Sequence, residues 1–245
     1  MFTNRSFKKG WIIFIVFILI MAVILAIPIM ASSGESANRT ETVFGYTYVF
    51  RSLIHNETSG SLGYQTTVWV TSANSVPVGY MGVKARLYNS SGALKAYTDW
   101  DYNIVQTNSF LQSGTYSTTS GFYYSCGHVK LYNGNGYTEF DSYATPYYSP
   151  SRNDNPIDRN LEIQYNEYGE VYGSELFLNE VGIQPDLILA ENSQGLVGYI
   201  RNLDLNYDPV TTLEDAIAYT KTSHERIVPL YLSDGRTVIG SFEIC

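Results

Sequence analysis

The longest hydrophobic run of the chain lies near its N-terminal end. Residues 11–31 contain no charged and no strongly polar side chain, and three basic residues, Arg5, Lys8 and Lys9, precede them. As a helix, a run of this length reaches about 30 Å, the thickness of a hydrocarbon core. Because basic flanks stay on the cytoplasmic side of a membrane, we expect everything after the run to lie outside the cell.

Two interpretations of this leader stay open. An uncleaved anchor fits its length, since the apolar core of a signal peptide has only about 7–15 residues. Cleavage after Ala31 is favoured by Pro28, which breaks a helix, and by the small residue at the cleavage position. Residues 1–31 are therefore predicted to be a signal peptide or a membrane anchor. The protein is expected to be secreted or held at the extracellular face of the cell membrane, with the membrane as a partner through residues 11–31 if the leader is uncleaved.

Beyond the leader, the pattern becomes that of β-strands. Residues 32–42 are polar, lack periodicity and are predicted to be a spacer. Residues 45–50 and 64–71 are rich in aromatic and β-branched side chains, and residues 80–88 alternate between apolar and polar positions. These stretches are expected to be strands of antiparallel sheets.

Two predicted hairpins share a turn sequence, Leu-Tyr-Asn-x-x-Gly, which occurs at residues 87–92 and 131–136. Asn and Gly tolerate the positive φ angles that tight hairpins need. Together with the two strands upstream, they predict an antiparallel β-sandwich over residues 43–150. The paired strands are expected at residues 80–88 with 93–102 and at residues 122–132 with 137–143.

The last part of the chain predicts a small α+β domain. Three prolines within residues 146–157 mark a boundary, so residues 151–170 are predicted to be a linker and residues 171–245 the domain. Thr211 and Glu214 have the spacing of a capping box, and Asp-Gly at position 234 is a hairpin-turn signal. The expected elements are strands at residues 186–190 and 196–205, a helix at 213–219, and a hairpin of 226–232 with 236–244. The fold class is therefore predicted to be mainly β, with an N-terminal transmembrane or signal helix, a sandwich and an α+β unit.

This tail resembles a segment of known but uncharacterised proteins. The stretches PDLILA, GYIRNLD, residues 211–218 and IVPLYLSDGRTVIGSF are similar to the tail of exported proteins of Gram-positive, clostridia-like bacteria, in which a leader and a Tyr-rich β region precede such a tail. The resemblance covers residues 170–244 and, more loosely, residues 78–150. No activity is assigned to that family, so the resemblance implies an envelope or secreted location and supplies no site residues.

Charge excludes one class of partner. The chain has a net charge of −8, and no acidic residue precedes Glu35, so removing the three positive charges of the leader leaves the exported part at −11. Such a surface repels phosphate backbones and anionic headgroups. We therefore expect no nucleic-acid partner.

Tyrosine is the most distinctive component, with 22 residues in the chain. Tyr rings combine a flat apolar face with a polar tip, which suits sugar rings and protein surfaces. The alternative is that they stabilise sheets as cross-strand partners. The candidate binding residues are Tyr123, Tyr124, Tyr132, Tyr137, Tyr143 and Tyr147.

The two cysteines, Cys126 and Cys245, permit one disulfide in an exported protein. Such a bond would attach the C-terminus to the predicted sandwich. The alternative is a buried Cys126 with an unpaired terminal cysteine.

A weak calcium candidate lies near the predicted helix. Asp204, Asn206, Asp208 and Asp215 have spacings that partly match a calcium loop, but Pro209 occupies the position of the required glycine. A solvated strand end leading to a helix cap explains the same residues. We therefore expect no metal and no cofactor.

Candidate catalytic groups are few. Cys126 and His128 are spaced to share a strand face, but no acid that would orient the histidine is evident. Asp99 and Asp101 also share a strand face, but the carboxylate pairs of glycosidases usually come from different elements, and two acids on the solvent face of a sheet are ordinary. The sequence therefore favours a non-enzymatic envelope protein, a binding or interaction module with a Tyr-rich β face. Its partner would be cell-wall glycan or a surface protein. A secreted bacteriocin-like effector and a cell-wall hydrolase are the alternatives.

Overall fold

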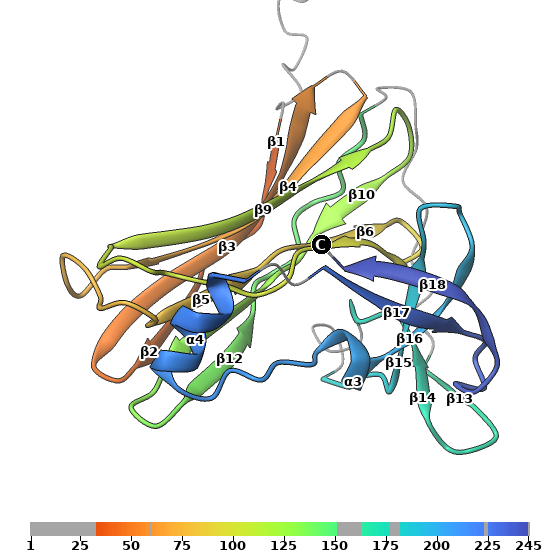
Figure 1. Cartoon of the computed structure of the whole chain (residues 1–245). Coiled ribbons are helices and arrows are strands. Elements are labelled where there is room, and N and C mark those ends of the chain that lie inside the picture. Colours follow the sequence, from red (N-terminus) through yellow and green to blue (C-terminus); the bar gives the residue numbers. More distant parts are fainter. Residues whose placement is uncertain (1–32, 59, 151–162, 177–181, 223–224, 245) are drawn as a thin grey trace, which may run out of the picture. The chain divides into compact units, whose positions relative to one another are not determined.

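The structure is a computed structural model that describes residues 33–58, 60–150, 163–176, 182–222 and 225–244. In these residues the protein is mainly β, with several antiparallel sheets and two short helices (Figure 1). Residues 33–245 form one compact unit by their contacts. The predicted leader, residues 1–31, lies outside the described residues. Within the described ranges, neither helix has the length and apolarity needed to cross a bilayer.

The first sheet has five antiparallel strands. β3 and β4 form its centre, and β9 pairs with the other side of β4 along nine residues. One of its strands and most of another lie in residues 32–42, the stretch predicted to be a spacer, where the charged residues Arg39 and Glu41 hide the strand pattern. The strands are β1 (Ser33–Glu35), β2 (Arg39–Val43), β3 (Tyr46–Thr58), β4 (Ser61–Val70) and β9 (Ser109–Ser117).

A four-stranded sheet packs against the first. Phe50 and Val68 of the five-stranded sheet share a buried cluster with Val83 and Leu131 of the four-stranded one. Burying each such side chain stabilises the fold by about 1.5–3 kcal/mol, which explains why the alternating positions of the sequence face inward here. The order is β12-β11-β5-β8, formed by β5 (Met81–Lys84), β8 (Asp101–Tyr102), β11 (His128–Tyr132) and β12 (Tyr137–Asp141).

Both predicted hairpin turns are confirmed, but two predicted strands are each divided between sheets. Residues 80–88 form β5 and then β6 (Arg86–Asn89), and residues 122–132 form β10 (Tyr123–Ser125) and then β11. β5 pairs with β11, whereas β6 pairs with β10 in another sheet. The chain bends at Gly127, where a Cβ atom would lie 1.8 Å from the hydroxyl oxygen of Thr66. Such a close approach needs glycine.

The third sheet has nine strands and takes them from both sides of the predicted linker. Its main path is β10-β6-β7-β15-β16-β17-β18, and Leu94 of β7 pairs with Ala190 of β15. Residues 151–162 of the predicted linker lie outside the described residues. The remaining strands are β7 (Leu94–Tyr97), β13 (Gln164–Tyr165), β14 (Val171–Gly173), β15 (Leu187–Glu191), β16 (Val197–Arg201), β17 (Arg226–Tyr231) and β18 (Val238–Ile244).

The two helices correct details of the predicted tail. The strand expected over residues 196–205 ends at Arg201, and α3 (Asn202–Leu205) follows it. Helix α4 (Leu213–Thr220) begins where expected, but its capping box is one residue further along, formed by Thr212 and Asp215. The hairpin of β17 and β18 is confirmed. Its loop is longer than an Asp-Gly turn, since the N–H of Leu232 donates to the carbonyl of Thr237.

Candidate functional site

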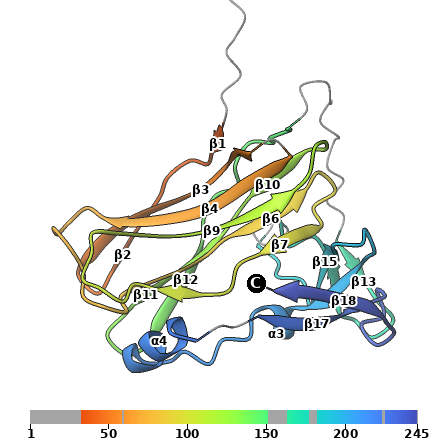
Figure 2. The same ribbon diagram turned by 45° about the horizontal axis from the view of Figure 1, so that its top comes forward.

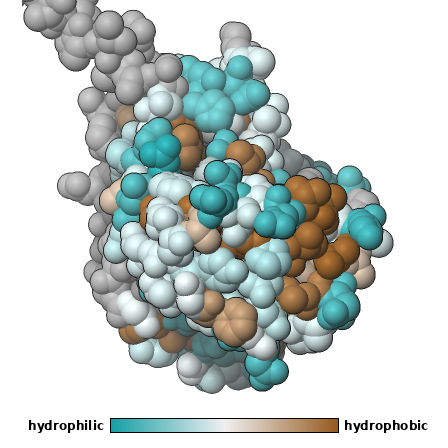
Figure 3. All heavy atoms as spheres, turned by 90° about the vertical axis from the view of Figure 1, so that its left-hand side faces the viewer, coloured by the Kyte–Doolittle hydropathy of each residue, from teal (hydrophilic) through white to brown (hydrophobic). Residues whose placement is uncertain are grey.

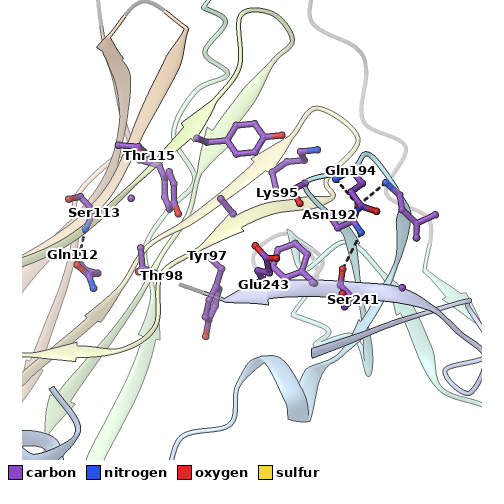
Figure 4. Close-up of a pocket in the computed structure, with 18 of the residues that line it drawn as sticks. Lys95, Tyr97, Thr98, Gln112, Ser113, Thr115, Asn192, Gln194, Ser241 and Glu243 are labelled. Atoms are coloured by element: carbon purple, nitrogen blue, oxygen red, sulfur yellow. Dashed lines mark hydrogen bonds between the residues drawn. The ribbon is translucent and has the colours of Figure 1, made fainter. Parts of the chain in front are cut away.

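The protein contains a cleft of about 640 Å³, a volume typical of ligand sites (Figure 4). Three segments far apart in the sequence contribute most of its walls: residues 95–98 of β7 and its end, residues 112–116 of β9, and residues 239–243 of β18. The β15–β16 turn closes one end with Asn192 and Gln194. The site therefore exists only in the folded chain.

The curl of the nine-stranded sheet creates this cleft. β7 and β18 are separated by three strands along the sheet, yet both line the cleft, and Figure 2 shows the end of β18 beside β7. Tyr97 of β7 and Phe242 of β18 belong to one buried cluster, around which the strands close. β7 is paired with β15 only at Leu94, and the residues that follow, 95–98, line the cleft.

The cleft is lined by hydroxyl, amide and aromatic groups with few charges. Lys95 pairs with Glu191, with 2.7 Å between Nζ and Oε1, and its ammonium group lies 5.5 Å from the ring centre of Tyr116. Burial disfavours the charged form of Lys95, but the hydrogen bonds with Glu191 and Tyr116 outweigh it and raise the pKa of Lys95. Lys95 therefore lines the cleft as an ammonium group already paired with a carboxylate.

Three of the predicted binding tyrosines are part of the packed interior. Tyr123 and Tyr124 are buried, and the ring of Tyr124 is stacked on Tyr88 at 5.1 Å. Tyr147 is half-buried and its ring contacts that of Tyr124 edge-on at 5.7 Å. These contacts fit the sheet-stabilising interpretation of the Tyr pattern.

The other three predicted tyrosines lie elsewhere. The rings of Tyr132 and Tyr137 are 5.9 Å apart and half-buried, and the hydroxyl of Tyr137 donates to the carbonyl of Gly79 at 2.7 Å. Tyr143 is 50% exposed. The structure does not bring the six tyrosines onto one surface, and none of them lines the cleft. The tyrosines that do, Tyr64, Tyr97 and Tyr116, come from three different strands.

A second polar site lies around His128. Its Nδ1 atom is 2.9 Å from Asp141 and 3.4 Å from Glu139, and its Nε2 atom is 3.8 Å from Glu175. A cavity of about 360 Å³ adjoins this cluster. Burial favours the neutral form of Asp141, but the contact with His128 outweighs it and holds the pKa of that carboxyl below its usual value.

Cys126, the cysteine considered beside this histidine in the sequence, has a hydrogen-bond partner elsewhere. Cys126 is buried, and its Sγ–H donates to the carbonyl of Ser142 at 3.2 Å. Asp99 is likewise engaged, since it accepts a hydrogen bond of 2.8 Å from the hydroxyl of Tyr219. Cys126 and Asp99 are therefore parts of packed hydrogen-bond networks. The partner proposed for Cys126 in a disulfide, Cys245, lies outside the described residues.

The calcium candidates are separated by their own contacts. Asn206 accepts hydrogen bonds from Lys84 at 2.8 Å and from Arg86 at 2.6 Å. Asp208 forms an ion pair with Lys130, and Asp215 caps α4. Asp204 lies within α3. The described residues contain no group of three or more His, Cys, Asp or Glu side chains arranged for a metal ion.

An exposed hydrophobic area is the third surface feature. Figure 3, which shows the left-hand side of the view in Figure 1, has hydrophobic side chains gathered on one part of the surface, with mostly hydrophilic or intermediate surface around them. The exposed apolar residues of the described chain include Phe44, Ile104 and Val105. Nothing in the structure specifies what would cover such an area.

The cleft could not be predicted from the sequence, because each of its strands carries ordinary polar and aromatic residues. The one available signal was β9, whose nine residues contain no charge. No protein-family model and no curated protein matches the chain.

Proposed function

We propose that this protein is a non-enzymatic binding module of the bacterial cell envelope, secreted or anchored through residues 11–31. The observation that carries the proposal is the cleft between β7, β9 and β18 (Figure 4). Its size is that of a ligand site, and its polar groups and tyrosine rings are the chemistry that holds glycans and polypeptides.

The fold also supports a binding role, because sheets form the walls of the cleft. The five-stranded and four-stranded sheets, packed through one core, are consistent with a β-sandwich over residues 43–150, and the later strands with an α+β unit over residues 171–245. Rigid sheets hold the cleft walls in place, so that little ordering is needed when a ligand binds. The ligand site is thus proposed where β7 and β9, from the earlier part of the chain, meet β18 from the later part, in place of a Tyr-rich face.

A hydrolase is less well supported. The carboxylates near His128 are each engaged by basic or hydroxyl groups: Glu175 pairs with Arg86 and accepts a hydrogen bond from Tyr88. Carboxylates that are already paired with charged and hydroxyl groups are held in place, and this leaves them little capacity for a substrate. No feature of the described residues favours a bacteriocin-like effector.

The test is binding of the purified full-length chain to insoluble peptidoglycan and to intact Gram-positive cells. Glu243→Trp would fill the cleft from β18, and we expect at least a tenfold loss of retention. Ile227→Trp is the matched control, because Ile227 is the direct partner of Glu243 on β17, is 72% exposed and lies outside the cleft lining. Equal retention of both variants, or no retention of the unmodified chain on either material, would contradict the proposal.

A further inference from the structure

The end strand β9 differs from the other long end strands of the described sheets. β2, β12 and β18 each contain at least one charged residue, and β18 also pairs with β17 through a shifted register. β9, with the sequence SFLQSGTYS, has no charge and no proline, and it pairs with β4 over nine residues without a register shift. Exposed strand edges are normally protected by charges, prolines or bulges, because they are templates for further pairing.

The register shows which backbone groups of β9 are directed outward. The N–H of Val70 donates to the carbonyl of Asn108 at 2.9 Å, and the N–H of Thr118 donates to that of Gly60 at 3.0 Å. Residues of an antiparallel strand alternate between its two neighbours. The even-numbered residues of β9 therefore bond to β4, and the odd-numbered ones, Ser113 and Thr115 among them, present N–H and C=O groups to the outer edge.

One of these outward groups is bonded to a side-chain amide. The N–H of Ser113 donates to Oε1 of Gln112, its own neighbour, at 3.1 Å (Figure 4). A side-chain amide has the same acceptor chemistry as a peptide carbonyl. Gln112 thus occupies the position that the backbone of an added strand would take, within the cleft wall.

The opposite wall of the cleft does not offer an equivalent edge. Asn192 donates from Nδ2 to the carbonyl of Ser241 on β18 at 3.1 Å, and Oδ1 of Asn192 accepts from the N–H groups of Gln194 and Leu196. Because Asn192 is held by its own turn, this bond is preorganised and closes part of the β18 edge. The edge available for pairing is that of β9.

We propose that the cleft receives an extended peptide segment of another protein, which pairs with the outer edge of β9 as an added strand and replaces Gln112 at the Ser113 N–H. This deepens the proposed function and rests on it, since it names the ligand of the same cleft. Main-chain bonds to β9 supply affinity, and the alternate side chains of the segment contact β7 or solvent. Glu243 in the lining and the acidic exported surface disfavour an acidic segment.

The dimensions favour a single segment over a second copy of the chain. A cleft of about 640 Å³ accommodates a short extended stretch, whereas the edge of a second sheet brings its own packed face with it. Self-pairing through β9 is the competing outcome, and it has a distinct readout in the oligomeric state.

The test uses twelve-residue peptides selected from a random display library on the immobilised full-length chain. Each selected peptide is synthesised in three versions: one unmodified, one N-methylated at the amides of odd-numbered residues, and one N-methylated at those of even-numbered residues. Only amides directed toward β9 donate to it, so we expect one methylated series to bind at least tenfold more weakly and the other to bind like the unmodified peptide. Hydrogen exchange at Ser113 and Thr115 should slow on binding.

Two proline variants test whether the peptide binds at the outer edge of β9. Ser113→Pro removes an outward N–H and no bond to β4, and it should weaken peptide binding at least tenfold. Ser109→Pro is the matched control, because its N–H is also directed outward but lies outside the cleft lining. It should bind as the unmodified chain does.

Four results would overturn the inference. Equal binding of both methylated series would exclude strand pairing. Peptide binding unchanged by Ser113→Pro would place the segment elsewhere. A dimer of the unmodified chain that Ser113→Pro dissociates would assign the edge to a second copy. If no peptide is selected but Glu243→Trp abolishes retention on peptidoglycan, the peptide ligand is rejected and the proposed function stands. If no binding depends on the cleft, the peptide ligand and the proposed function are both rejected.

Discussion

Arg86 of β6 and Glu175, in the segment after β14, form an ion pair in the interior, with side chains 0% and 5% exposed. Glu175 also accepts a hydrogen bond from the hydroxyl of Tyr88. The two residues are far apart in the sequence, so this pair ties the later part of the chain to the earlier one. Burial disfavours the charged forms of both, and their mutual attraction offsets that penalty: the pKa of Glu175 is held below its usual value.

Breaking this ion pair should destabilise the protein strongly. We expect Glu175→Gln to lower the free energy of unfolding by about 3–5 kcal/mol, because it leaves the Arg86 guanidinium buried without a counter-charge. The measurement is urea unfolding monitored by tyrosine and tryptophan fluorescence. The double variant Arg86→Met/Glu175→Leu is the control and should lose less than Glu175→Gln, since it removes both charges; a larger loss in the double variant would contradict this account.

Acid should weaken the network around His128. The pKa of Asp141 is lower in the folded chain than in the unfolded chain, so its carboxylate contributes stability that is present above about pH 4 and is lost as the pH falls through the folded value. Asp141→Asn should therefore reduce the decrease in urea midpoint between pH 6 and pH 3. Asp204→Asn, in α3, is the comparison variant. If Asp141→Asn follows the pH profile of the unmodified protein, Asp141 is not part of the acid response.

Gly127 should not tolerate a side chain. A Cβ atom there would lie 1.8 Å from Thr66 Oγ1 and 2.5 Å from the carbonyl oxygen of Lys84. Relief of this overlap requires the two sheets to shift at the point where residues 122–132 pass between them. We expect Gly127→Ala to cost at least about 1–3 kcal/mol in unfolding free energy. Gly34→Ala, where the nearest atom is 3.1 Å away on the side chain of Ile54, should cost less.

The capping box of α4 makes a residue-level prediction. The hydroxyl of Thr212 accepts from the N–H of Asp215, and the carboxylate of Asp215 accepts from the N–H of Thr212. Thr212→Ala should lower the free energy of unfolding by about 0.5–2 kcal/mol. Glu214→Ala, which alters the residue expected from the sequence alone, should change it by a few tenths of a kcal/mol, since its carboxylate is not the capping group. Chemical denaturation of both variants tests the assignment, and a larger loss for Glu214→Ala would refute it.

Local chemistry decided much of the fold. Gly92, Gly134 and Gly136 have positive φ angles, and the side-chain oxygens of Asn89 and Asn133 accept hydrogen bonds from N–H groups within the same turns, so both turns follow from the sequence. The start of α4 and the hairpin of β17 and β18 are local in the same sense. The capping residue predicted from local sequence was wrong by one position, Thr211 instead of Thr212, because adjacent Thr residues have the same capping chemistry.

Sheet membership and the cleft were decided by tertiary structure. The alternation within residues 80–88 is the same whether they form one strand or two. Their division between the pairs β5–β11 and β6–β10 depends on tertiary contacts, such as the close approach of Gly127 to Thr66. Likewise, no local pattern indicates that the Ser113 edge of β9 faces Tyr97 and Ser241 across one cleft. The sequence by itself determined that the chain beyond residue 31 is β-rich, acidic and divided by turns. Tertiary structure decided which strands lie at the edges of the sheets. A strand is at an edge when no further strand pairs with its outer side, and this depends on long-range packing.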